Sequence, residues 1–80
     1  MGKFRPFMIK NFDYSKEADQ ELYDNYMEMI ERKRSGYNIN DILASANWDL
    51  QVMSNKYKMN PTESLARKVR AMYNVVMDNE

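Results

Sequence analysis

The apolar spacing between residues 39 and 57 constrains the fold of this chain more than any other feature. Apolar side chains recur there at steps of three and four residues, the period of one helix face. They are Ile39, Ile42, Leu43, Ala46, Leu50, Met53 and Tyr57. Asn38 or Asn40, both residues that favour helix N-caps, stands at the start. The pattern predicts an amphipathic helix over residues 39–58.

Two further segments show helical patterns. Residues 15–35 carry a broad apolar face, with Ser15 as a candidate N-cap and Gly36 placed to end the helix. Residues 60–78 open with Asn60 and Pro61, which suit the N-cap and the first helical position. Short connections pack neighbouring helices closely. We therefore expect one all-α domain, 1–80, built from three helices.

Residues 1–14 form an apolar arm ahead of the helices. Phe4, Phe7 and Ile9 make it too apolar for a free tail, and Pro6 favours extended backbone. We expect the arm to pack on the helices, either as plain extended chain or with one short strand.

Composition excludes several classes of chemistry. The 80 residues contain no Cys and no His, so disulfides, thiolate zinc sites, cysteine nucleophiles and catalytic imidazoles are ruled out. The only glycines are Gly2 and Gly36, which leaves no phosphate-binding loop. We expect no enzyme, no catalytic residue, no metal and no cofactor. The chain shows no membrane span or secretory signal, which predicts a cytoplasmic protein without a membrane partner.

Acidic residues follow one another along the first helix at steps of four and three. This acidic line consists of Glu17, Glu21, Asp24, Glu28 and Glu31. At helical pitch the five side chains fall within about 80° of arc, opposite the apolar face. They form either an ordinary solvated face or a docking surface for a protein partner with a basic surface.

Trp48 lies on the side of the 39–58 helix opposite its core stripe, and Val52 follows one turn later. One interpretation is that the arm covers this second apolar face, with Phe4, Phe7 or Ile9 on Trp48. The other is that Trp48 and Val52 are exposed apolar anchors for a partner, a second copy included.

The last two helices also resemble the layout of a helix-turn-helix. Arg67, Arg70 and Asn74 would then lie on one polar face of the last helix, with chemistry suited to phosphates and base edges. Twelve basic residues are balanced by twelve acidic ones, which disfavours independent binding of DNA.

Three functions follow from these features. The first is a small protein–protein interaction module. With nine Asn, eight Met, six Tyr and seven Lys beside five Ala and no His, the chain resembles in composition the accessory proteins of phages and other mobile elements. The resemblance implies inhibition or redirection of a host or defence protein, in the host cytoplasm. The alternative is a dimeric helix-turn-helix protein that binds nucleic acid. A second alternative is a structural or assembly component that forms homodimers.

Overall fold

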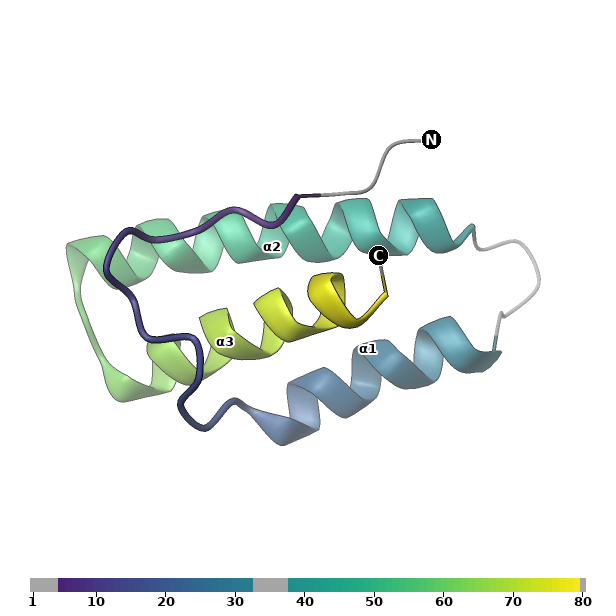
Figure 1. The fold of residues 1–80 in the computed structure, drawn as a ribbon, viewed down its shortest axis with the longest axis horizontal. Helices are drawn as coiled ribbons and strands as arrows, with labels where there is room; N and C mark the ends of the chain where they lie inside the picture. The colour runs from purple at the N-terminus through teal and green to yellow at the C-terminus, as the bar shows by residue number, and fades with distance from the viewer. Residues whose placement is uncertain (1–4, 33–37, 80) are drawn as a thin grey trace.

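The computed structural model of the chain describes residues 5–32 and 38–79. They form three helices, α1 (Gln20–Arg32), α2 (Ile39–Met59) and α3 (Glu63–Asp78), and these residues contain no strand. α2 runs antiparallel to the other two (Figure 1). The prediction of an all-α three-helix domain is confirmed, and over residues 5–14 the arm is extended and turn backbone without a strand.

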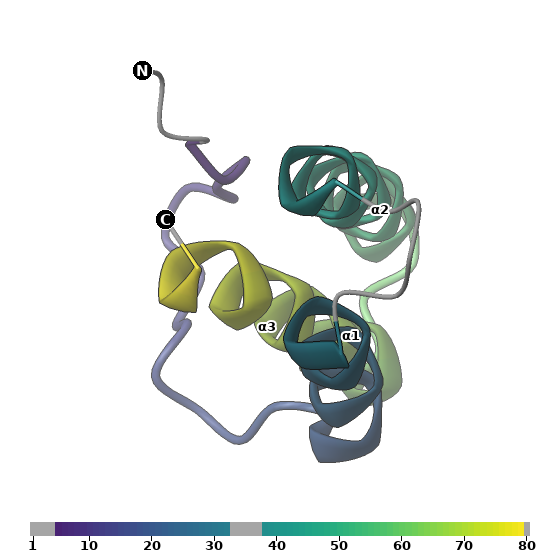
Figure 2. The same ribbon diagram turned by 90° about the vertical axis from the view of Figure 1, so that its right-hand side faces the viewer.

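α3 is the central helix of the domain. It packs against both α2 and α1, more extensively than these two pack against each other, and the end-on view places the arm on its remaining side (Figure 2). Side chains around most of its circumference are therefore buried: Ala66, Val69, Arg70, Ala71, Met72, Val75 and Val76. The predicted core stripe of α2 is confirmed at its centre, where Ile42, Leu43, Ala46 and Leu50 are buried.

α1 begins at Gln20, so the prediction of a helix start at Ser15 is wrong. The Asp19 carboxylate accepts a hydrogen bond from the N–H of Leu22 at 3.1 Å and thereby caps the helix. Ser15 instead donates its N–H and hydroxyl to Asp13 in a local turn, at 3.0 and 2.5 Å. The turn satisfies these groups outside the helix. The predicted end of this helix, at residues 35–36, lies outside the described residues.

The cap at the start of α2 agrees with the prediction, whereas the junction between α2 and α3 uses different residues from those predicted. Asn38 caps α2 as expected, accepting from the N–H of Asn40 at 2.8 Å. Asn60 closes α2 through a bond from its N–H to the Lys56 carbonyl at 2.9 Å, so it does not begin α3. Thr62 caps α3, its hydroxyl accepting from the Leu65 N–H at 3.2 Å.

The arm follows α2, turns at the end where α2 meets α3, and crosses to the start of α1 (Figure 1). The N–H of Phe7 donates to the side-chain oxygen of Asn47 at 3.2 Å, and Lys58 Nζ lies 5.0 Å from the centre of the Phe7 ring. Farther along, the rings of Tyr14 and Tyr73 stack with centroids 4.2 Å apart. The arm is thus packed against the helical core, as expected.

Candidate functional site

Four of the five residues of the acidic line lie on α1 and are exposed to solvent. We call them the acidic face: Glu21, Asp24, Glu28 and Glu31. They project from the side of α1 opposite Tyr26 and Ile30, which face the core. One neighbour orients a member of the face, since the amide of Gln20 donates to Asp24 at 2.9 Å. The acidic face therefore extends over most of the helix.

Glu17 does not belong to this face, because it precedes the helix. Its carboxylate pairs with Arg67 at 3.2 Å, and its backbone carbonyl accepts a bond from Arg70 at 3.5 Å. This acid therefore lies in the segment between the arm and α1, where it contacts α3.

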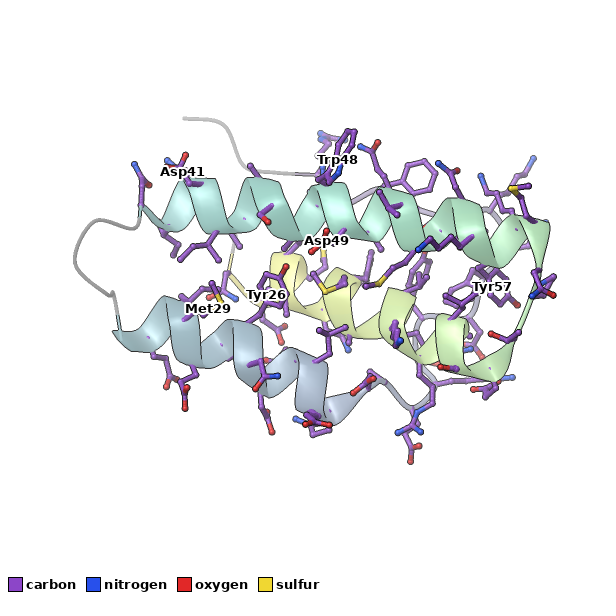
Figure 3. All side chains as sticks on the ribbon, turned by 180° about the vertical axis from the view of Figure 1, so that it is seen from behind. Tyr26, Met29, Asp41, Trp48, Asp49 and Tyr57 are labelled. Carbon is purple, nitrogen blue, oxygen red and sulfur yellow. The ribbon has the colours of Figure 1, made fainter. Side chains whose placement is uncertain are left out.

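Trp48 and Val52 form a second exposed surface, on α2. Trp48 is 66% exposed and Val52 36%. Phe7 and Ile9 of the arm pack against the core cluster, and Phe4 lies outside the described residues. Trp48 points away from α1 (Figure 3). The structure therefore does not bring the acidic face and these two apolar residues together on one surface.

The seam between α1 and α2 carries two hollows that the sequence analysis missed. One, of about 250 Å³, is lined by Leu22, Asn25 and Met53 among others, and the other, of about 160 Å³, by Met29 and Ile42 among others. No spacing within one helix could have revealed them, since the larger is lined by residues of all three helices, Lys68 of α3 included, and the smaller by residues of α1 and α2.

A hydrogen bond crosses the seam beside the smaller hollow, which Tyr26 also lines. The hydroxyl of Tyr26 donates to the carboxylate of Asp49 at 2.6 Å, and the two side chains lie between the helices (Figure 3). Burial, reinforced by this bond and by the nearby negative charge, raises the pKa of Tyr26 to about 12. The phenol is therefore protonated at neutral pH and acts as a link between α1 and α2.

The three candidate nucleic-acid residues of α3 do not form one exposed face. Arg70 is only 4% exposed. It donates to the Asp13 carbonyl at 2.9 Å and pairs with Glu63 at 3.2 Å, so it serves the packing of the arm. Arg67 and Asn74 are half-buried. The helix-turn-helix interpretation remains a prediction, without an exposed residue set on α3 to support it.

Within residues 5–32 and 38–79, no three acidic side chains gather as a possible metal site, and no helix has the length and apolar character to span a membrane. Comparisons of the chain with protein-family models, with curated proteins and with solved structures give no match.

Proposed function

We propose that this chain is a small protein-interaction module whose acidic face docks onto a basic surface of a partner protein. The observation that carries the proposal is the alignment of four exposed carboxylates on the side of α1 that the domain leaves unpacked. Like charges at steps of three and four cost an isolated helix a few tenths of a kcal/mol per pair. Helix stability therefore does not favour the arrangement, which supports recognition of a basic partner as its role.

The charge of the acidic face favours a protein over a nucleic acid as the partner. A row of carboxylates repels phosphates and attracts Lys and Arg side chains, and complementary potentials of this kind speed the encounter of two proteins. Of the three candidate nucleic-acid residues of α3, Arg70 is buried against the arm and so does not face a phosphate.

The proposed consequence of docking is inhibition or redirection of the partner. A basic groove occupied by the acidic face is closed to its own anionic ligand, so binding alone suffices and no catalysis is required. The resemblance in composition to accessory proteins of phages and mobile elements supports a host or defence protein as the target, met in the host cytoplasm.

Affinity capture with charge variants tests the proposal. The wild-type protein is immobilised and exposed to cell extract at moderate salt, with and without nuclease. We expect one protein to be retained in stoichiometric amount after nuclease treatment. The variant Glu21→Lys, Asp24→Lys, Glu28→Lys should lose it, since three attractive contacts become repulsive.

A milder pair of variants separates the acidic face from net charge. Asp24→Asn with Glu28→Gln removes two negative charges from the face, and Asn55→Lys with Asn60→Lys adds two positive charges at exposed positions at the far end of α2. Both variants change net charge by +2. The proposal requires weaker retention by the first variant only. Equal retention by both variants, or retention that disappears with nuclease, contradicts it.

A further inference from the structure

α2 carries a second stripe of residues on the side that faces solvent. Its members follow one another at steps of three, four, four, three and four, and all are exposed: Asp41, Ala44, Trp48, Val52, Asn55 and Met59. This outer stripe occupies about 80° of arc along the whole of α2. Its apolar members include Trp48, 66% exposed, and Met59, 87% exposed. Steps of three and four on one side are the pattern of a helix that packs against another helix.

The two ends of the outer stripe carry opposite charges. Asp41 lies in the first turn of α2, and Lys56 and Lys58 lie in its last turn. Lys56 and Lys58 flank Met59 around the helix, so both lysines border the stripe, Lys58 on the side of the arm, where its Nζ contacts the Phe7 ring. If a second helix of the same sequence packs antiparallel on this stripe, the acidic end of each helix lies beside the basic end of the other.

We propose that the occupant of the outer stripe is a second copy of this chain, with the two α2 helices antiparallel. A two-fold axis midway between Trp48 and Val52 sets Trp48 of each chain against Val52 of the other. The same register brings Asp41 of each chain to the end that carries Lys56 and Lys58 of the other. Such an interface is self-complementary, as two-fold symmetry requires.

The charges also select the direction of pairing. A parallel pair would set Asp41 against Asp41 and the lysines against lysines, and like charges across an interface oppose association. The antiparallel pair replaces both repulsions with attractions. This inference does not depend on the acidic face, which lies on α1.

Sedimentation equilibrium from micromolar to millimolar protein tests the proposal. We expect the apparent mass to rise to twice that of the chain. Trp48→Ala should raise the dimer dissociation constant about thirtyfold or more, as for a central interface tryptophan. Met8→Ala truncates an exposed apolar residue of the arm and should leave the dissociation constant unchanged. Circular dichroism of both variants reports whether the helices remain folded.

Charge reversal tests the direction of pairing. Asp41→Lys in one protein, and Lys56→Glu with Lys58→Glu in another, should each raise the dissociation constant of their own dimers about tenfold, because each creates like-charge contacts. Mixing the two variants should restore association in heterodimers. A mass that stays monomeric throughout overturns the proposal. So does a dimer that is indifferent to Trp48→Ala, or reversal variants that associate as tightly as the wild type.

Discussion

The guanidinium of Arg70 lies over the ring of Phe12, 4.8 Å from its centre, and its Nε donates to the backbone carbonyl of Asp13 at 2.9 Å. One buried cation of α3 thus contacts two consecutive residues of the arm. Glu63, two turns earlier on the same helix, balances its charge at 3.2 Å. The path of the arm across the helices depends on this side chain more than on any regular secondary structure.

Replacing Arg70 should therefore destabilise the domain. Arg70→Met leaves the Asp13 carbonyl without its donor and removes the contact with the Phe12 ring, so we expect the free energy of unfolding to fall by about 3 kcal/mol. Arg67→Met is the matched control, because Arg67 forms a partly exposed pair with Glu17 that is worth under about 1 kcal/mol. Urea denaturation measures both, and equal small losses would show that Arg70 does not hold the arm.

The role of Arg70 shows which part of the fold the sequence could predict. Periodicity located three helices and the buried centre of α2, since each helix must place one apolar face on the core. It did not show that α3 is central. A helix surrounded on several sides buries Ala71 and even Arg70, and only the packing of the other elements determines which helix that is.

In the candidate site, too, features that depend on spacing within one helix were predictable, and features that depend on contacts between elements were not. The acidic face follows from spacing alone and was found. Glu17 was wrongly placed on α1. Asp13 holds Ser15 in a local turn and Asp19 caps the helix, so residues 15–18 stay outside it. The exposure of Trp48 depends on the path of the arm, and the Tyr26–Asp49 bond joins two helices. Neither leaves a signal in local spacing.

The cap of α3 is open to a direct comparison of two residues. Thr62→Ala removes the hydroxyl that accepts from the Leu65 N–H, so it should cost about 1 kcal/mol of stability. Asn60→Ala should change stability by no more than about 0.5 kcal/mol, since the bond of Asn60 that closes α2 comes from its backbone. Thermal unfolding followed by circular dichroism distinguishes them. A larger loss of stability for Asn60→Ala than for Thr62→Ala would mean that Asn60, as predicted from the sequence, caps α3.

Ser54 offers a stabilising substitution. Its side chain is fully buried in α2, and its hydroxyl has no hydrogen-bond partner among residues 5–32 and 38–79. Ser54→Ala removes a desolvated polar group and improves helix propensity, so we expect a gain of about 1 kcal/mol in the free energy of unfolding. Ser64→Ala, at an exposed position of α3, gains only the propensity, a few tenths of a kcal/mol. A loss of stability in Ser54→Ala would mean that its hydroxyl is hydrogen-bonded.

The Tyr26–Asp49 bond predicts a loss of stability in alkaline solution. The pKa of Tyr26 rises from 10.0 to about 12 in the folded chain, chiefly through burial and then through the bond to Asp49. The folded state therefore holds this proton more tightly than the unfolded state. Its contribution to stability is complete below pH 10 and is lost as the pH rises from about 10 to about 12.

Tyr26→Phe isolates this contribution, because the raised pKa values of Tyr14 and Tyr23 affect the variant and the wild type alike. Above pH 10 the melting temperature of Tyr26→Phe should fall less steeply than that of the wild type. Asp49→Asn should lie between the two, since it removes the carboxylate but leaves the phenol buried. Parallel melting curves for wild type and Tyr26→Phe across this range would contradict a protonated link between α1 and α2.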